Sequence, residues 1–380
     1  MGKVKIVTRN KQDIETIQRE TVKKKLKIIR KQQTEDTQEE KIFTPSHLNL
    51  PVFVMSLPIH AKFLPNNAWM EELIQENSEE IQINIERFVY EWFTIYNCLT
   101  NEGIVLTFPS VPKLQDLHYI NSFVYLPHIK EPKTCIIARF RAEGRQQEEQ
   151  VAYDFLTKCG YTCHQPPFGL YFEGEPELRY LREDMYIGSY GVRGTRAALE
   201  WIESNFNCKV FKLGIETDKL FHGDCICFPI TPFDVLVGVN HVDKSELREL
   251  EKVANIIPIE DEGLLLNGIM NNISVGYTVY VGDYSLAFRD KKDLLEIEKK
   301  KKDVISNIAN NLGLEVVFIS LTQSLLQGAC LSCLVARLNY IDKFQMVAWK
   351  EGINSLAVEL IDETTLSKQV EILNEELEWF

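Results

Sequence analysis

The stretch Gln327–Leu338 reads Gln-Gly-Ala-Cys-Leu-Ser-Cys-Leu-Val-Ala-Arg-Leu, with small residues and two cysteines at the start of an apolar run. The run from Ala329 to Leu338 predicts a buried strand. A thiol at a strand edge beside a glycine-containing turn can be rigidly held and still be reached, as a nucleophile must be. The alternative interpretation is a cysteine that only fills the core, which is common for this residue type. Two other stretches of the chain decide between these interpretations.

Length and composition limit the classes of protein to consider. The 380 residues allow one large domain or two ordinary ones, and 45% hydrophobic and 10% aromatic residues suffice for a sizeable core. The net charge of -13 argues against nucleic acid as a partner of the main body. No apolar run reaches about 18 residues, so no transmembrane helix and no membrane partner are expected.

The cysteines and the N-terminal residues indicate a reducing compartment. The first residues carry no apolar signal region, and nine cysteines without such a signal indicate reduced thiols. We therefore expect a cytoplasmic protein. The pair Cys225 and Cys227 has no second pair and no histidine at ligand spacing, so it does not predict a zinc site.

Residues 1–42 differ in composition from the rest of the chain. They contain no aromatic residue, and a basic cluster that includes Lys23, Lys24 and Lys25 is followed by acidic residues. We expect a charged, flexible or helical tail over 1–42 and a single domain over 43–380. A docking arm for an acidic partner is the functional alternative for this tail.

A module of two strands, a helix and a third strand recurs from residue 122 onwards, which predicts an α/β fold. The four complete copies comprise segments 122–126, 135–140, 146–158 and 161–164; 170–173, 185–190, 195–205 and 208–214; 222–230, 235–239, 244–255 and 256–259; and 272–275, 278–281, 291–311 and 314–320. A fifth opens at 329–338 and continues with a strand at 346–349 and a helix at 365–377. The domain itself begins with a strand at 47–55, a helix at 79–99 and a strand at 104–108. A closed ring of about five such units would arrange their opening strands around a central channel.

Polar residues interrupt three of the opening strands. Glu173 follows an apolar run, His222 and Asp224 precede another, and Cys333 stands in the stretch quoted above. Alternate residues of a strand face the same side, so His222 and Asp224 are predicted to point together into the channel. A thiolate nucleophile needs a base or cation nearby, an imidazole needs a carboxylate to fix its tautomer, and buried carboxylates suit a cationic substrate. These four residues supply all of those parts.

With these residues in view, the chain resembles the guanidine-modifying enzymes: dimethylarginine dimethylaminohydrolases, arginine deiminases, arginine dihydrolases and amidinotransferases. It is most similar to the microbial dimethylarginine dimethylaminohydrolase-like branch, in order over about residues 50–350. The segments that resemble motifs of that branch are Asn67-Ala68-Trp69-Met70, Phe172-Glu173-Gly174-Glu175-Pro176-Glu177, Ile187-Gly188-Ser189-Tyr190-Gly191-Val192-Arg193, Phe221-His222-Gly223-Asp224 and Cys333-Leu334-Val335-Ala336-Arg337-Leu338. The chain departs from the motifs at Pro176-Glu177, where the branch has Gly-Asp, and at Gly223, where it has Leu.

The resemblance implies a pentein fold, a five-bladed pseudo-symmetric α/β propeller, and it implies roles by position. Cys333 rather than Cys330 would attack the guanidinium carbon, His222 would protonate the leaving amine and then activate water, and Glu173 would orient His222. The implied substrate-binding residues are Asp224, Arg193, Arg139, Asn67, Asn121 and Asn271. No metal and no organic cofactor are implied.

The function predicted is cysteine-dependent hydrolysis of a C–N bond in a free guanidino compound, arginine or a methylated arginine, through a covalent thiouronium intermediate. An amidinotransferase with the same Cys-His-Glu triad is the first alternative, because water access to the intermediate decides between the two. The second alternative is a non-catalytic binding protein on the same scaffold. The sequence leaves open whether two copies form a homodimer.

Overall fold

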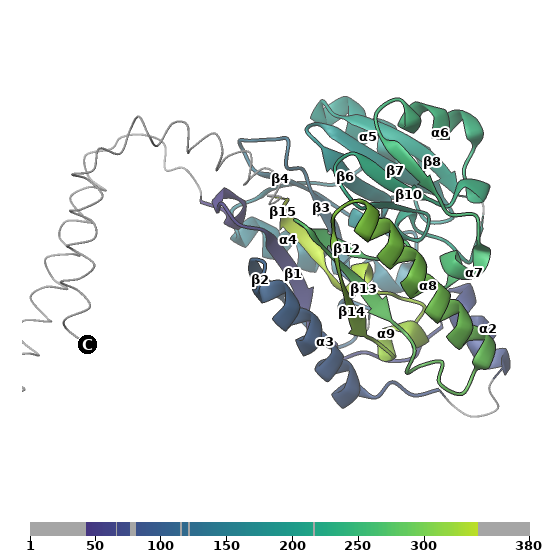
Figure 1. Cartoon of the computed structure of the whole chain (residues 1–380). Coiled ribbons are helices and arrows are strands. Elements are labelled where there is room, and N and C mark those ends of the chain that lie inside the picture. The colour runs from purple at the N-terminus through teal and green to yellow at the C-terminus, as the bar shows by residue number, and fades with distance from the viewer. Residues whose placement is uncertain are drawn as a thin grey trace, which may run out of the picture. The chain divides into compact units, whose positions relative to one another are not determined.

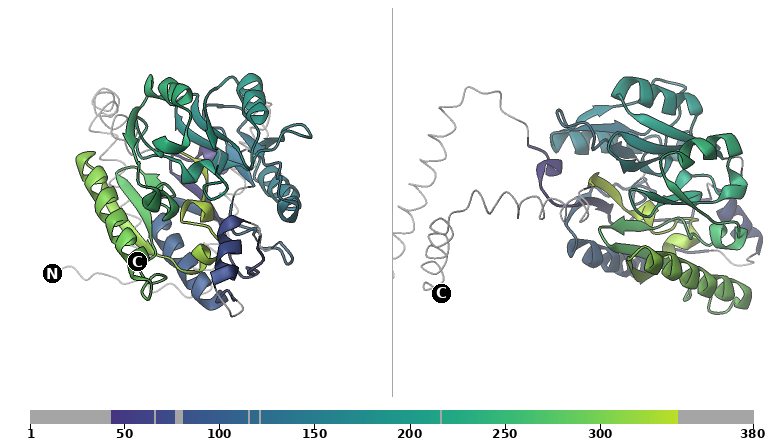
Figure 2. Two further views of the ribbon diagram at one scale, coloured as in Figure 1. Left: turned by 90° about the vertical axis from the view of Figure 1, so that its right-hand side faces the viewer. Right: turned by 45° about the horizontal axis from the view of Figure 1, so that its top comes forward.

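The computed structural model describes residues 43–340 apart from 66, 77–80, 115, 121 and 216. The predicted tail at 1–42, and the strand and helix predicted at 346–349 and 365–377, lie outside the described residues. Within the described part, five sheets of three strands each are arranged with helices towards the outside (Figures 1 and 2). We call each sheet with its helix a blade.

The bounds of the blades follow the predicted module. Blade 1 contains β3 (Phe123–Tyr125), β4 (Thr134–Ile137), α4 (Glu148–Lys158) and β5 (Thr162–His164); blade 2 contains β6 (Leu178–Arg182), β7 (Met185–Gly191), α5 (Arg196–Phe206) and β8 (Lys209–Ile215); blade 3 contains β9 (Cys227–Pro229), β10 (Asp234–Val237), α6 (Lys244–Glu251) and β11 (Asn255–Pro258); blade 4 contains β12 (Ile273–Val275), β13 (Thr278–Asp283), α8 (Lys292–Asn311) and β14 (Glu315–Ser320); blade 5 contains β15 (Ala336–Asn339), β1 (Val52–Ser56), α3 (Ile85–Thr100) and β2 (Ile104–Phe108). The remaining helices are α2 (Ala68–Glu76), α7 (Glu262–Leu266) and α9 (Gln323–Leu326).

Every blade has the same connectivity. The opening strand pairs antiparallel with the second strand, and the second pairs parallel with the third. A parallel pair needs a long crossover, and the blade's helix provides it. Side-chain caps fix where three of these helices begin: Asn84, Thr195 and Asp243 each accept a backbone N–H from the first turn of the helix that follows. None of the helices in the described residues is long and apolar enough to cross a membrane.

Blade 5 is built from both ends of the described chain. Its opening strand β15 pairs antiparallel with β1, with Ala336 opposite Val54 and Asn339 opposite Val52. The second and third strands of this blade therefore come from the N-terminal side of the domain, and the strand predicted at 346–349 is not needed to complete the sheet. This pairing joins residues about 290 positions apart and closes the ring.

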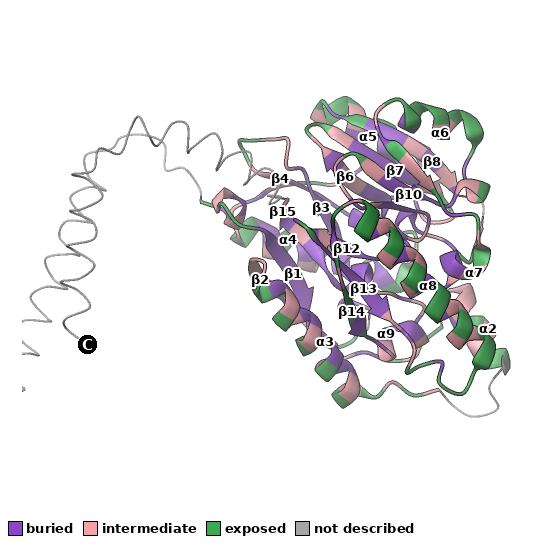
Figure 3. Ribbon diagram, viewed as in Figure 1, coloured by how far each residue is buried: buried purple, intermediate pink, exposed green. Residues whose placement is uncertain are grey.

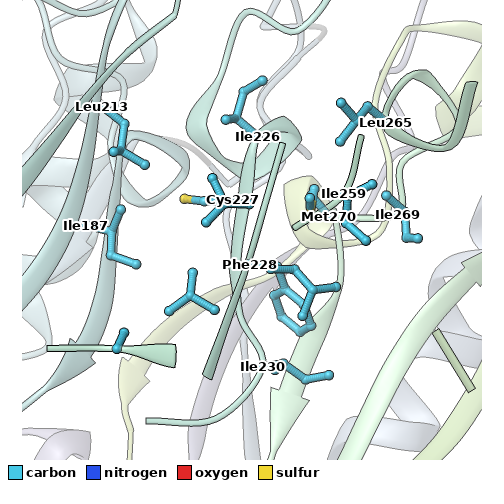
Figure 4. Packing of buried hydrophobic residues seen from close by; sticks show 14 of the residues in the cluster. Ile187, Leu213, Ile226, Cys227, Phe228, Ile230, Ile259, Leu265, Ile269 and Met270 are labelled. Carbon is cyan, nitrogen blue, oxygen red and sulfur yellow. The ribbon is translucent and has the colours of Figure 1, made fainter. Parts of the chain in front are cut away.

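The apolar core lies between neighbouring blades. One cluster joins Ile187 of blade 2, Phe228 of blade 3 and Val279 of blade 4, and Figure 4 shows part of it. Three further clusters join blades 4 and 5, blades 5 and 1, and blades 1 and 2. Each blade is thus packed on both sides. The second strands are largely buried, whereas the third strands β2, β5, β11 and β14 and the outer helix faces are partly exposed (Figure 3).

The opening strands differ most from the sequence prediction. The segment 170–173 forms no strand and makes only an isolated bridge between Phe172 and Arg139, whereas β6 starts at Leu178. In the segments 222–230 and 329–338, short 3-10 turns at Gly223–Cys225 and Ser332–Leu334 replace the first part of the predicted strand. Chemistry-bearing residues therefore stand in the turns directly before the opening strands. The repeated connectivity brings these turns to one end of the channel.

Candidate active site

Cys333 lies in the middle of the 3-10 turn Ser332–Leu334, just before β15. The turn is fixed by Leu334 N–H donating to the Leu331 carbonyl, and the Cys333 carbonyl accepts Ile120 N–H at 2.9 Å. The side chain is buried with 8% exposure. The sequence predicted a thiol at a strand edge; the structure gives a thiol on a rigid turn, which meets the same requirement through different backbone geometry.

A buried carboxylate and an amide flank the Cys333 thiol. Asn271 Nδ2 is 3.4 Å from Cys333 Sγ, and Asp224 Oδ2 is 3.6 Å from it. The same Asp224 oxygen accepts hydrogen bonds from Asn271 Nδ2 at 2.8 Å and from Ser332 Oγ at 2.7 Å. Asn271 Oδ1 in turn accepts Ser332 N–H at 2.7 Å. The three side chains hold one another in place behind the sulfur, as a preorganised site requires.

The position of Asp224 corrects the reasoning that predicted it. His222 has extended backbone, but Gly223–Cys225 is a 3-10 turn, so strand alternation does not relate the two side chains. They nevertheless converge on Cys333, Asp224 by direct contact and His222 across the cavity described below. Ser332 was missed by the sequence prediction, although its place beside the proposed nucleophile was an available signal.

His222 is paired with Glu173. Its Nε2 lies 2.8 Å from Glu173 Oε2, and both side chains are buried. Burial alone would raise the pKa of Glu173, but the hydrogen bond and charge of His222, together with the guanidinium groups of Arg193 and Arg145, lower it to about 2. Glu173 is therefore a carboxylate at neutral pH and fixes the orientation of the imidazole.

One oxygen of Glu173 remains available. Oε1 is buried and has no hydrogen-bond partner among the described residues, although it forms a 3.8 Å ion pair with Arg193 Nη1. A buried carboxylate oxygen without a donor is costly, so such an atom marks a place where a ligand donor fits. This oxygen is the acceptor that a guanidinium N–H requires.

Glu177, one of the departures from the family motif, supports the Glu173 backbone. Its Oε2 accepts Glu173 N–H at 2.7 Å. Burial and the neighbouring Glu173 charge raise the pKa of Glu177 well above its usual value. Burial and the Glu173 charge thus both disfavour a second negative charge beside the Glu173–His222 pair.

Glu173, His222 and Cys333 line a cavity of about 40 Å³. Its lining consists of Asn67, Asp116, Tyr119, Arg145, Glu173, Arg193, Phe221, His222, Gln327, Gly328, Ala329 and Cys333. A second cavity of about 90 Å³ shares Phe221, His222, Gly328 and Cys333 with the first and also touches Asp224 and Asn271. His222 and Cys333 therefore stand between two spaces, so a substrate group and a leaving or attacking group could approach from different sides.

Of the other predicted binding residues, Arg193 and Asn67 line the cavity and Arg139 does not. Arg193 reaches the cavity and lies 4.9 Å from the centre of the Phe221 ring, and Asn67 lines the cavity while donating from Nδ2 to the Gln327 carbonyl at 3.0 Å. Arg139 is not brought into the cavity, because its guanidinium donates to the Pro166 carbonyl at 2.7 Å and to the Gln165 side chain at 2.9 Å. Asn121 lies outside the described residues.

Arg145 and Tyr119 were not predicted to bind substrate, yet both line the cavity. Arg145 is buried and forms a 2.6 Å ion pair with Glu148, and its Nη2 also donates to the Tyr119 carbonyl at 2.8 Å. The Tyr119 hydroxyl donates to Gln327 at 2.8 Å. Spacing gave no signal for these residues, because they belong to a loop before β3 and a turn before α4. In the described part of the chain, no three His, Cys, Asp or Glu side chains gather into a group that could hold a metal ion.

The environment of Cys333 predicts how fast the free protein reacts with alkylating agents. Burial, with the negative charge of Asp224, raises the pKa of the Cys333 thiol well above its usual value. The thiol is therefore protonated at neutral pH, and we expect the rate of its alkylation by iodoacetamide to rise roughly tenfold per pH unit between pH 7 and pH 9. Peptide mapping by mass spectrometry measures the rate at Cys333 alone. A rate that stays level over this range would mean that the thiolate already exists and would contradict this assignment.

Comparisons with known proteins match this geometry. No family model matches the chain. In sequence it is 24% identical over 276 residues to the bifunctional arginine dihydrolase/ornithine cyclodeaminase AgrE of Nostoc sp., covering 71% of this chain and 35% of that protein. It is also 24% identical over 164 residues to the similarly named ArgZ of Synechocystis sp., covering 42% of this chain and 22% of that protein. The chain thus spans about a third or less of the length of these curated relatives.

Solved structures show the same fold. The N-terminal domain of ArgZ, an arginine dihydrolase with bound product, has a TM-score of 0.64 at 20% identity and covers 77% of this chain and 99% of that one. A dimethylarginine dimethylaminohydrolase adduct with S-methyl-L-thiocitrulline has a TM-score of 0.56 at 13% identity, covering 76% and 99%. The predicted pentein fold is therefore confirmed, as is the resemblance to the guanidine-modifying enzymes.

Proposed function

We propose that this pentein-fold chain hydrolyses a C–N bond of a small free guanidino compound, with Cys333 as the nucleophile. The observation that carries the proposal is the meeting of the Cys333 thiol and the His222–Glu173 pair around one cavity, with the buried Asp224 in contact with the thiol. A Cys-His-carboxylate set with buried acids suits a cationic electrophile. The two curated relatives carry arginine dihydrolase in their names, and this supports the same class of reaction here.

The carboxylates would hold the substrate by its planar cation. Glu173 Oε1 lacks a hydrogen-bond donor among the described residues, and Asp224 is fully buried beside the thiol. Two carboxylates on different sides of a guanidinium fix its plane and attract positive charge to its carbon. The cation would in turn favour the thiolate form of Cys333, because an opposite charge nearby lowers the pKa of a buried thiol. Substrate binding and activation of the nucleophile are thereby linked.

The reaction then proceeds in two steps. The Cys333 thiol gives its proton to His222 as Sγ forms a bond to the guanidinium carbon, and the bond from that carbon to the leaving nitrogen breaks as His222 delivers this proton to the departing amine. The product of this step is a thiouronium adduct on Cys333. His222, now neutral, removes a proton from a water molecule that attacks the same carbon, and the C–S bond breaks to give a ureido product and the free thiol. The proton that His222 takes from water passes to the departing Cys333 sulfur. Glu173 stabilises the positive charge on His222 whenever the imidazole holds a proton in transit.

Two alternative functions must be distinguished from hydrolysis by experiment. An amidinotransferase would use the same triad but pass the amidino group from Cys333 to an amine instead of water. A non-catalytic binding protein would have no use for a buried Glu173–His222 pair beside a buried thiol, and such groups are costly unless they serve a function. The names of the relatives favour hydrolysis over transfer.

A panel of guanidino compounds tests the proposal. The protein is incubated with L-arginine, asymmetric dimethylarginine or guanidinoacetate, and ammonia, methylamines, citrulline and ornithine are measured. Hydrolysis predicts release of ammonia or an alkylamine with a ureido product or ornithine from at least one compound. Addition of glycine as an acceptor separates the alternatives, since formation of a new guanidino product would favour transfer. A folded protein that turns over none of these compounds would contradict both enzymatic proposals.

We further propose that the protein is cytoplasmic and that two copies form a homodimer. All nine cysteines of the sequence lie in the described part of the chain and are free thiols, which supports a reducing compartment. The state of oligomerisation is open to measurement by light scattering.

A further inference from the structure

A larger cavity, of about 310 Å³, shares no lining residue with the two cavities that Cys333 lines, and it lies towards the opposite ends of the opening strands. The proposed catalytic residues precede the opening strands, whereas this cavity is lined by the later parts of the same strands and the loops after them. Arg182 ends β6, Pro229 ends β9, Val275 ends β12 and Asn339 ends β15, and all four line the cavity. Its volume is at the lower end of those that bind small molecules. We call it the distal cavity.

Arg179 supplies an unused cationic group to the distal cavity. It lies on β6 and lines the cavity, and its guanidinium makes no hydrogen bond and no ion pair with any residue in the described ranges. A guanidinium carries five N–H donors in a planar fork that matches a carboxylate. Burial opposes the charge of Arg179, but Glu175 and Asp224 outweigh it and raise its pKa above the usual value. The group is therefore a cation in the lining of the distal cavity.

Three of the other charged residues of the cavity wall, Arg182, Arg337 and Glu175, are already engaged. Arg182 donates to the Pro232 carbonyl at 2.6 Å and to the Val253 carbonyl at 2.7 Å, and Arg337 donates to the Ser274 carbonyl. Glu175 Oε2 accepts Arg337 N–H at 2.8 Å. With three arginines and two glutamates in the lining, the cavity carries a net positive charge. It is therefore suited to an anion rather than to the cationic substrate of the opposite end.

The remaining lining favours a ligand with an apolar body. Phe228 forms part of the buried core beneath the cavity, and Phe233 stands at its edge with 62% of its surface exposed and the Arg182 guanidinium 4.8 Å from its ring centre. Ile230 and Val275 add aliphatic surface. A cavity with one free cationic fork and mostly apolar walls selects a molecule with one anionic end and a hydrophobic remainder.

We propose that the distal cavity binds a small organic carboxylate, whose carboxylate group pairs with Arg179 and whose apolar body packs against Phe228 and Phe233. This site is separate from the guanidine site, and the proposal does not depend on the proposed reaction. It is carried by the free donors of Arg179, the engaged state of its neighbours and the apolar walls.

Isothermal titration of the full chain with benzoate tests the proposal, because benzoate combines one carboxylate with a planar apolar body. We expect saturable binding at millimolar concentration or below, weakened at least about tenfold by Arg179→Met, which keeps the apolar stem and removes the donors. Phe233→Ala should weaken binding several-fold, and its exposed position makes it safe for folding. Arg196→Met is the matched control, since Arg196 lies on α5 outside the cavity and should leave binding unchanged.

Three outcomes would overturn the proposal. They are no saturable binding of benzoate to the folded wild-type protein, equal binding by the wild type and Arg179→Met, or binding of inorganic phosphate where benzoate does not bind. If Arg179→Met fails to fold, Arg179→Lys, which keeps the charge but not the fork, and Phe233→Ala decide the question. Undiminished benzoate binding by both of these variants would equally overturn it.

Discussion

Replacing Cys333 by serine is expected to reduce guanidine cleavage by at least about 10³-fold and to leave the fold intact. A serine hydroxyl stays protonated where a thiol is activated, so the covalent step fails. The two side chains are similar in size, and a hydroxyl can keep the contacts with Asn271 and Asp224. Release of ammonia or alkylamine measures the loss, and circular dichroism with a thermal melt verifies the fold.

Cys330→Ser is the matched control for this variant. Cys330 is three residues away in the same stretch, and burial raises the pKa of its thiol to about 11. It lines the second cavity but not the first, so its loss should change turnover little. Full activity in Cys333→Ser, or an equal loss in both variants, would contradict the assignment of Cys333 as the nucleophile.

Replacing His222 by glutamine is expected to lower turnover by about 10²- to 10⁴-fold. The amide can still donate a hydrogen bond to Glu173, which avoids an unpaired buried carboxylate, but it cannot carry a proton to the leaving amine or take one from water. Because the second step depends on that proton transfer, any adduct that forms on Cys333 should persist longer than in the wild type. Steady-state rates and intact mass after acid quench measure the two effects.

The control for this change is His164→Gln. His164 ends β5 on the exposed surface of blade 1 and does not line the cavity. It should therefore leave both the rate and the adduct unchanged. Turnover by His222→Gln within a few-fold of the wild type would mean that another group moves the protons.

The sequence predicted the outer parts of the blades better than the inner ones. The helices α4, α5 and α8 and the second and third strands fall close to their predicted ranges, because their apolar periodicity and end signals are local. The strand predicted at 104–108 coincides with β2. The opening strands β3 and β12 fall within their predicted ranges, whereas those of blades 2, 3 and 5 start later than predicted. In these three blades, Gly174 at φ 73° and the 3-10 turns Gly223–Cys225 and Ser332–Leu334 break the extended backbone where polar residues stand. The pairing of β15 with β1 has no local signal at all.

Sequence pattern singled out Glu173, His222, Asp224 and Cys333, but their individual roles and the other binding residues were predicted only through the resemblance. Periodicity placed His222 and Asp224 on one strand face, and the structure shows a 3-10 turn between them. Their convergence on Cys333 results instead from the ring, which brings the turns before several opening strands to one end of the channel. Arg139 shows the limit of carrying roles over by position, because its guanidinium is bound to the loop at Pro166 and Gln165.

The central claim is that Cys333 forms a covalent bond to a guanidine carbon, while His222 transfers the protons and Glu173 orients His222. The most direct test is an acid-quenched mass spectrum of His222→Gln after incubation with L-arginine, followed by peptide mapping. The account predicts an added mass equal to arginine less ammonia, on the peptide that contains Cys333, and no such mass in the variant that also carries Cys333→Ser. An unmodified Cys333 in a protein that still consumes arginine, or the same added mass on a different residue, would contradict it.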